Sequence, residues 1–340
     1  MKKSIIAAAL AGTLLLSGCS GSPGGSGEQA PEVSVDTPIG APETTELTIA
    51  LSAPNLDSQA PVYIALDKGY YEDEGLTINV IDADNIREGL IGGSLDVAVE
   101  DAAAVVDAAV AGTGLKIVAG YRARQPYIIA ASADIQDPSD LEGRQIILGD
   151  APGVPINDVR MDIMAQEGGF DIRDVGWKDV YPPGFSNAWV ENFVAGQVAL
   201  TPVFPRHIPI VEEAGGHFII NTMKEWPNDV LAASESWISA NPNTLARFIR
   251  ATTKGMALYK DLSQQEYVQS MMEKADFKIT DTEREPEIYA YGPELYNENM
   301  LMLEESRYAE ALSAFGMDMP EWSTFVDTTQ LERAQKSLDE

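Results

Sequence analysis

The sequence has one cysteine, two histidines and few basic residues, and each scarcity excludes a class of protein. The single cysteine, Cys19, rules out an internal disulfide framework and a cysteine-based zinc site. Lysine and arginine total 23 against 53 acidic residues, a net charge of −30, and such a surface repels nucleic acid and anionic lipid head groups. The acidic residues are spread along the chain without an Asp-x-Asp-x-Asp-Gly loop, so we interpret them as solvated faces. We expect no nucleic-acid partner and no bound metal.

Standard catalytic motifs are also missing. The sequence contains no Gly-x-Ser-x-Gly motif, no phosphate-binding loop and no His-Glu-x-x-His motif. We interpret His207 and His217 as surface residues or as residues whose hydrogen bonds are satisfied. The sequence therefore predicts a protein without catalytic residues and without a cofactor.

The first eighteen residues have the layout of an export signal. Lys2 and Lys3 precede an apolar run from Ile5 to Leu16, which is followed by Ser-Gly and Cys19. The run is shorter than the ~20 residues that a bilayer-spanning helix needs, and no later segment has an uninterrupted apolar run of that length. The sequence therefore predicts secretion and not membrane spanning.

Cys19 has two interpretations. Leu16-Ser17-Gly18-Cys19 resembles the lipobox of bacterial lipoproteins, in which the cysteine is acylated and becomes the new N-terminus; the alternative is an ordinary signal peptide with a chance cysteine. We favour lipidation because the cysteine is the sole one in the chain. We expect a signal peptide over residues 1–18, and a protein outside the cytoplasm that a lipid on Cys19 anchors to the bacterial cell membrane.

The segment after Cys19 has the composition of a linker. It is rich in serine, glycine and proline, then in proline, threonine and glutamate, with no apolar periodicity that could nucleate a core. We therefore expect a disordered tether over residues 19–46.

The chain from Leu47 onward alternates short apolar runs with helix-like stretches, which is typical of β-α-β units around a parallel sheet. Strands are predicted in a first series at 47–52, 76–81, 95–99 and 115–120, and in a second at 127–132, 145–148, 179–181, 200–204 and 217–221. The helices between them are predicted at 61–71, 85–92, 102–111, 156–166, 187–195 and 208–214. After a strand at 230–233 the chain becomes helical, beginning with a helix that ends near Lys260.

These elements predict an α/β protein of two Rossmann-like lobes. Lobe 1 would comprise residues 47–121 and 230–340, with the C-terminal helices packed on it, and lobe 2 residues 122–229. The chain would cross between the lobes at Tyr121–Gln125 and Met223–Asp229. Two crossings predict a two-segment hinge that can close around a ligand.

Five sequence blocks carry a family resemblance. The first runs from Pro61 to Leu76 and includes Lys-Gly-Tyr-Tyr and Glu-Gly-Leu; the others are Gly92–Ala98, Leu115–Ala119, Asp137–Arg144 and Ala195–Val198. In this order and spacing, over about residues 47–260, they resemble the solute-binding proteins for nitrate, sulfonates, taurine and thiamine-pyrimidine precursors. The resemblance implies a type II periplasmic-binding-protein fold, a small-molecule ligand in the interlobe cleft, and delivery to an ABC permease with its ATPase. It also implies a monomer, since such proteins dock one to one.

Open α/β sheets bind ligands beyond the carboxyl ends of their strands. In both lobes this rule selects residues that follow a predicted strand. The ligand-binding candidates are Asn55, Asp57, Gln59, Glu100, Asp101, Tyr121, Gly153, Val154, Tyr181, Phe204 and Arg206.

Glu100 and Asp101 occupy a turn that, in the resembling family, carries small or hydroxyl residues facing an anionic ligand. Asp101 can cap the following helix. Glu100 in the cleft would oppose nitrate or sulfonate and favour a ligand that donates hydrogen bonds, such as an aminopyrimidine, another nitrogen heterocycle or an amine. Arg122 and Arg124 permit the opposite interpretation, as partners of a carboxylate, phosphate or sulfonate, or they pair with acidic residues at the hinge surface.

The sequence thus predicts the solute-binding component of an ABC importer, with a pyrimidine, a vitamin precursor or another nitrogen heterocycle as the best guess for the ligand. The alternatives are an anion-binding importer component, a ligand-sensing lipoprotein and a pyrimidine synthase-like enzyme. By resemblance, that enzyme needs clustered histidines and a cysteine-rich motif, both of which this sequence lacks.

Overall fold

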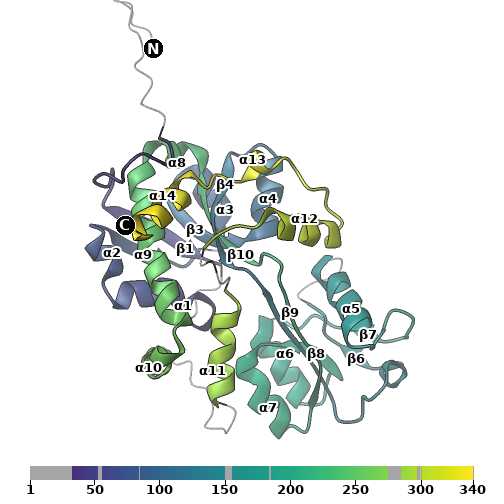
Figure 1. The fold of residues 1–340 in the computed structure, drawn as a ribbon. Helices are drawn as coiled ribbons and strands as arrows, with labels where there is room; N and C mark the ends of the chain where they lie inside the picture. Colours follow the sequence, from purple (N-terminus) through teal and green to yellow (C-terminus); the bar gives the residue numbers. More distant parts are fainter. Residues whose placement is uncertain are drawn as a thin grey trace, which may run out of the picture. The chain divides into compact units, whose positions relative to one another are not determined.

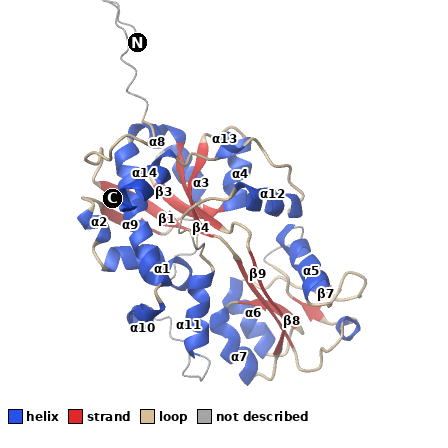
Figure 2. Ribbon diagram, viewed as in Figure 1, coloured by secondary structure: helices blue, strands red, loops and turns tan. Residues whose placement is uncertain are grey.

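Two five-stranded sheets with helices packed around them form the chain from Ser34 onward (Figures 1 and 2). The computed structural model describes residues 33–52, 56–83, 85–149, 155–183, 185–274, 285–296, 299 and 301–339. This arrangement confirms the predicted α/β class and the two sheets.

The first sheet has the strand order β2-β1-β3-β10-β4. Its strands are β1 (Glu46–Leu51), β2 (Thr77–Ile81), β3 (Val97–Asp101), β4 (Leu115–Arg122) and β10 (Asp229–Ser234). The helices of this half are α1 (Leu56–Asp67), α2 (Tyr70–Asp73), α3 (Ile86–Gly92) and α4 (Ala102–Val110). β2, β1 and β3 are parallel, whereas β10 runs antiparallel between β3 and β4, so its first residue lies at the carboxyl ends of both.

The second sheet has the strand order β7-β6-β8-β5-β9. Its strands are β5 (Gln125–Ala131), β6 (Gln145–Ile146), β7 (Lys178–Asp179), β8 (Leu200–Val203) and β9 (His217–Lys224). Its helices are α5 (Pro155–Glu167), α6 (Phe185–Val194) and α7 (Ile208–Glu213), with 3-10 turns at Pro138–Leu141 and Pro205–His207. The chain passes between the sheets twice, from β4 to β5 and from β9 to β10.

The C-terminal part of the chain is helical. It comprises α8 (Glu235–Ala240), α9 (Pro242–Lys260), a 3-10 turn at Leu262–Gln264, α10 (Gln265–Lys274), α11 (Glu285–Glu294), α12 (Glu305–Ala314), α13 (Trp322–Phe325) and α14 (Thr329–Asp339). In the described part of the chain no helix has the length and apolar character needed to cross a membrane.

Helix α9 packs against α1 and α14 on one face of the first sheet (Figure 1). α9 and α1 approach closely at Gly255, where a Cβ atom would lie 2.2 Å from the carbonyl oxygen of Pro61. On the same side, the rings of Tyr71 and Phe248 stack with centroids 5.2 Å apart. α12 and α13 contribute to the core on the opposite face, so the prediction that C-terminal helices cover the first sheet is confirmed. The exception is α12, which also contacts the core of the second sheet.

Residues 34–45 correct the expectation of a tether extending to residue 46. Glu43 accepts hydrogen bonds from the backbone N–H groups of Asn243 (3.1 Å) and Thr244 (2.8 Å), at the start of α9. The buried Arg333 of α14 donates to the carbonyl oxygens of Thr37 and Pro38, both at 2.9 Å. These contacts hold a polar segment that has no apolar pattern of its own, which is why composition alone did not identify it. Residues 1–32, with the signal segment and Cys19, lie outside the described residues.

Candidate functional site

The carboxyl edge of the first sheet gathers three carboxylates. β10 pairs with β3 so that Asp229 lies opposite Asp101, and with β4 so that Asp229 lies opposite Arg122. Glu100 precedes Asp101 at the end of β3. The sequence rule for strand ends predicted Glu100 and Asp101. It missed Asp229, which is the first residue of its strand and reaches this edge because β10 is antiparallel.

Asp229 and Arg122 form a buried ion pair. The Asp229 Oδ2 atom is 2.5 Å from Arg122 Nη2 and 2.8 Å from Nε, and the two residues are 3% and 7% exposed. Burial opposes the charge on Arg122, but the Asp229 carboxylate keeps the pKa of the guanidinium above its usual value. The interpretation of Arg122 as paired with an acid is therefore correct, although the residue is buried and not at the surface. Arg124 does form a more exposed pair, with its Nη2 atom 2.9 Å from Glu225 Oε1.

Glu100 is half-buried, and its Oε1 atom accepts a hydrogen bond from the Asp101 N–H group at 2.9 Å. Burial raises the pKa of Glu100; the charge of Arg87 acts against this shift, while Asp229 and Glu88 add to it. Within the described residues no cation forms an ion pair with Glu100. Among the described residues, only the Asp101 N–H and the charge of Arg87 partly compensate this carboxylate.

Asp101 caps α4, because its Oδ1 atom accepts the Ala104 N–H at 2.9 Å. Enclosure by protein atoms, followed by the charges of Asp229 and Glu100, raises the pKa of Asp101 to about 6. The side chain still reaches solvent, which moderates this shift. The capping role considered from the sequence is confirmed.

Gln59 lies in α1, just beyond β1, at a kink with φ −127° and ψ 22°. Its side chain is 0% exposed, and among the described residues neither the amide nitrogen nor the amide oxygen has a hydrogen-bond partner. A buried polar group without a partner costs about 1–3 kcal/mol, so this amide is available to a ligand or a water molecule. Of the other candidates near it, Asn55 lies outside the described residues, and the side chain of Asp57 is not described.

Three predicted residues lie at the carboxyl edge of the second sheet. The Tyr181 hydroxyl donates to Asp179 Oδ2, and burial together with the Asp179 charge raises the pKa of Tyr181 to about 12. Phe204 is half-buried, and the Arg206 guanidinium carbon lies 4.9 Å from the centre of its ring. Gly153 and Val154, the candidates from the loop before α5, lie outside the described residues.

The buried His207 accepts the Phe204 N–H on its Nδ1 atom at 3.4 Å. Burial, and then the Arg206 charge, lowers the pKa of His207 to about 3, so the imidazole is neutral. This agrees with its interpretation as a satisfied residue.

Protein atoms cover nearly all of the Tyr121 side chain, and its role as a ligand contact stays a prediction. The residue is buried in β4, and its ring meets Tyr296 edge-on with centroids 5.5 Å apart. Tyr121 therefore packs as a core residue at the hinge.

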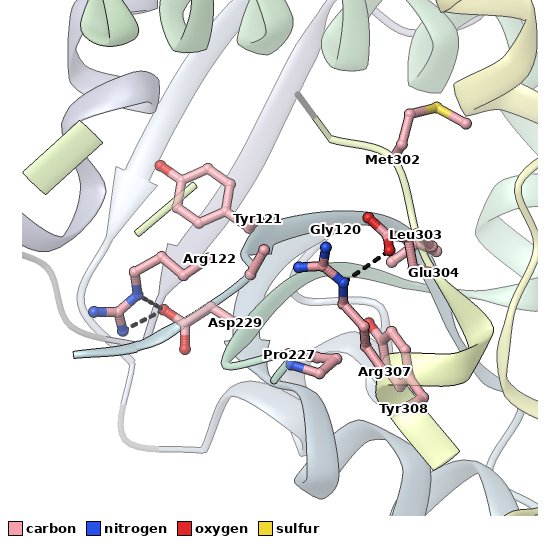
Figure 3. Close-up of a pocket in the computed structure, with 11 residues that line it drawn as sticks. Gly120, Tyr121, Arg122, Pro227, Asp229, Met302, Leu303, Glu304, Arg307 and Tyr308 are labelled. Atoms are coloured by element: carbon pink, nitrogen blue, oxygen red, sulfur yellow. Dashed lines mark hydrogen bonds and ion pairs between the residues drawn. The ribbon is translucent and has the colours of Figure 1, made fainter. Parts of the chain in front are cut away.

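A small, partly open pocket with a cavity volume of about 20 Å³ lies at the hinge (Figure 3). The Arg122–Asp229 pair lines one part of it and the Arg307–Glu304 pair another. Tyr308 also lines it, and its buried hydroxyl has no hydrogen-bond partner within the described part of the chain. Sequence analysis did not find this pocket, because Tyr308 reaches the hinge from a helix far along the chain.

Comparison with known proteins identifies the family. A family model described as "NMT1/THI5 like" matches residues 57–262. The chain belongs to the NMT1/THI5-like family. The chain is also similar to the formylaminopyrimidine-binding protein of Halalkalibacterium halodurans, with 26% identity over 207 residues. That match covers 57% of this chain and 60% of the relative, so the chain spans about three fifths of the relative's length.

Solved structures show that this NMT1/THI5-like chain has the periplasmic-binding-protein fold. The periplasmic nitrate-binding protein of Synechocystis PCC 6803 has a TM-score of 0.65 at 15% identity and covers 88% of this chain and 90% of its own. The periplasmic aliphatic sulphonate-binding protein of Escherichia coli has a TM-score of 0.60 at 14% identity and covers 80% and 86%. At these identities the likeness establishes the fold, and it confirms the fold implied by the five sequence blocks.

Proposed function

We propose that this chain is the extracytoplasmic solute-binding component of an ABC importer. It would capture a nitrogen heterocycle, such as a pyrimidine or another vitamin precursor, between its two lobes, and deliver it unchanged to a permease driven by an ATPase. The observation that carries the ligand class is Glu100, a half-buried carboxylate at the carboxyl edge of the first sheet that forms no ion pair with any described residue. The formylaminopyrimidine-binding relative supports the same class.

Glu100 and Gln59 select a ligand by charge and by hydrogen bonding. A ligand that donates a hydrogen bond or carries a positive charge would compensate Glu100, and a charge-assisted hydrogen bond is stronger than a neutral one. Gln59 adds a second requirement, because its unpartnered amide offers one donor group and one acceptor. A heterocycle edge that bears an amino group beside a ring nitrogen has the complementary pattern.

An anionic ligand is the second candidate, since the nitrate- and sulphonate-binding proteins share the fold. An anion requires an available cation. Arg122 is already paired with Asp229, and Arg206 lies over the ring of Phe204. The carboxylates of Glu100 and Asp101, at the edge of the first sheet, would also repel an anion.

A binding screen tests the ligand class. Thermal shift measurements of the purified chain should show a hit among aminopyrimidines or other nitrogen heterocycles and none with nitrate or alkanesulfonates, because a ligand that binds the folded state raises its melting temperature. An anion as the sole class of hit would overturn the assignment of Glu100 to the ligand.

Glu100→Gln then tests the residue. Loss of a charge-assisted hydrogen bond of about 1.5–3 kcal/mol weakens binding by roughly tenfold or more, measurable by calorimetry. Glu88→Gln is the matched control: Glu88 is an exposed carboxylate on α3 that influences Glu100 only through its charge, and its variant should bind nearly as the parent does. Equal affinities for the parent and Glu100→Gln would contradict the proposal.

The proposed anchor is a lipid on Cys19. Replacing Cys19 with serine should move the protein from the membrane fraction to the soluble fraction, and mass spectrometry of the parent should show a diacylglycerol adduct. A parent that is soluble and carries no lipid would contradict the anchor.

A ligand-sensing lipoprotein would share the cleft and the anchor. Deletion of the gene separates the two functions: uptake of the ligand should be lost if the protein is an importer component. We further propose that the protein is a monomer, and light scattering, which measures its molar mass in solution, tests this.

A further inference from the structure

Helix α12 contacts the cores of both lobes. Tyr308 and Leu312 are buried in the cluster that packs on the first sheet. Ala311 and Phe315 pack with the cluster of the second sheet, which includes Trp226. Residues four apart lie on one face of a helix, so α12 presents one stripe to each lobe.

The start of α12 is fixed to the first lobe. The Gly120 N–H of β4 donates to the carbonyl oxygen of Leu301 at 2.8 Å, and the Ala123 N–H donates to that of Leu295 at 2.9 Å. The backbone of Gly120 lies close to that of Met302: a Cβ atom on Gly120 would be 3.1 Å from the carbonyl oxygen of Met302. The segment that leads into α12 therefore follows β4 up to the hinge.

A chain of ion pairs links the first turn of α12 to both crossings. The Arg307 side chain is 2.8 Å from Glu304 through Nε and 3.2 Å from Glu225 Oε2 through Nη2. The other oxygen of Glu225 is 2.9 Å from Arg124. Glu225 belongs to the β9–β10 crossing and Arg124 to the β4–β5 crossing. Figure 3 shows Arg307 turned toward Glu304 beside the hinge pocket.

The other end of α12 meets the β9–β10 crossing at Trp226, a residue that belongs to the core cluster of the second sheet. Phe315 follows the last residue of the helix, and its ring contacts Trp226 edge-on, with centroids 6.2 Å apart and an interplanar angle of 62°. Such an aromatic pair contributes stability beyond its buried area. A rotation of one lobe relative to the other must change this contact, since the start of α12 is bound to β4.

We propose that α12 is a hinge brace, a third connection that restrains movement between the lobes in addition to the two crossings. The Trp226–Phe315 and Glu225–Arg307 contacts favour one arrangement of the lobes, and their loss shifts or broadens the distribution of arrangements. The inference rests on the proposed function in assuming that the lobes move. It does not depend on the identity of the ligand.

Distances between labels in the two lobes test the brace without a ligand. Cys19 is the sole cysteine, so the full chain with Cys19→Ser accepts spin labels at Asp107→Cys in α4 and Glu191→Cys in α6, both exposed positions. Electron–electron resonance then measures the interlobe distance distribution in this labelled parent. Phe315→Ala and Arg307→Gln are introduced separately. Arg173→Gln is the matched control, because it removes a surface ion pair with Asp171 within the second lobe.

Arg307→Gln should change the ratio of lobe arrangements by about 2- to 5-fold, and Phe315→Ala by up to about 10-fold. Arg173→Gln should leave the distribution as in the labelled parent. If Phe315→Ala does not fold, Phe315→Leu keeps the apolar contact with Ala311 and Trp226 without the aromatic ring, and should give a smaller change in the same direction. Distributions for Arg307→Gln and the Phe315 variant that match the control would overturn the brace. That result would not affect the assignment of the ligand class, because the distances are measured without a ligand.

Discussion

Removing the charge of Asp229 should destabilise the protein strongly. Asp229→Asn keeps the shape of the side chain but leaves the guanidinium of Arg122 buried without a carboxylate, at a position where Arg122 is 7% exposed. Breaking a buried ion pair by removing one partner costs about 3–5 kcal/mol, and the asparagine oxygen can still accept a hydrogen bond, so we expect the lower end of that range. At roughly 1.5–2 °C per kcal/mol for a fold of about 300 residues, the melting temperature should fall by about 5–6 °C.

Thermal unfolding followed by circular dichroism measures this loss. Arg173→Gln, which breaks an exposed ion pair, should leave the melting temperature nearly unchanged. The double variant Arg122→Met, Asp229→Leu removes both charges and should recover part of the loss, since apolar residues of similar volume can replace a buried pair. If Asp229→Asn has the same melting temperature as Arg173→Gln, the reasoning about the buried charge is wrong.

Three further predictions concern other parts of the fold. Glu43→Ala should destabilise the protein by about 1–2 kcal/mol and speed amide exchange in the first turn of α9, because Glu43 caps that helix from another segment; unchanged exchange would contradict the cap. Gly255→Ala should lower stability by about 1–3 kcal/mol in denaturant titrations, because its Cβ would meet the carbonyl oxygen of Pro61 at 2.2 Å. The pKa of Asp101 is raised from 3.8 to about 6, so this group favours the folded state most below pH 4 and its contribution falls as pH rises toward 6. Asp101→Asn, which can still cap α4, should therefore become more stable relative to the parent as pH rises from 4 to 6. A stability difference between variant and parent that stays constant over this pH range would exclude the raised pKa of Asp101.

The sequence alone predicted the helices and strands wherever a local residue pattern determines them. The apolar runs and glycine stops predicted most strands and helices to within a few residues; α3, for example, spans Ile86–Gly92 against a prediction of 85–92. The predicted helix at 61–71 was less accurate, because the chain is already helical at Leu56 and turns at Gly69, whose φ is 71°. A proline in the pattern suggested a helix start, whereas Pro61 follows a kink at Gln59 inside the helix.

The site was only partly predictable for a different reason. Glu100 lies at the end of β3 and Gln59 in the helix that follows β1, so the strand-end rule finds them. Asp229 and Tyr308 reach the hinge through an antiparallel strand and a distant helix, and their positions depend on sheet order and tertiary packing. Local periodicity carries no information on either.

The docking of residues 34–45 limits how far the binding lobes can travel from the proposed anchor. Arg333 and the start of α9 hold this segment, so the contour length of the chain between Cys19 and Ser34 sets the upper limit of that distance. At ~3.3–3.6 Å per residue, that length extends to at most about 50 Å. A lipidated protein would therefore sample a thin layer above the bilayer, with the α9–α14 side nearest its point of attachment, and would meet a permease at a local concentration far above its average in the compartment.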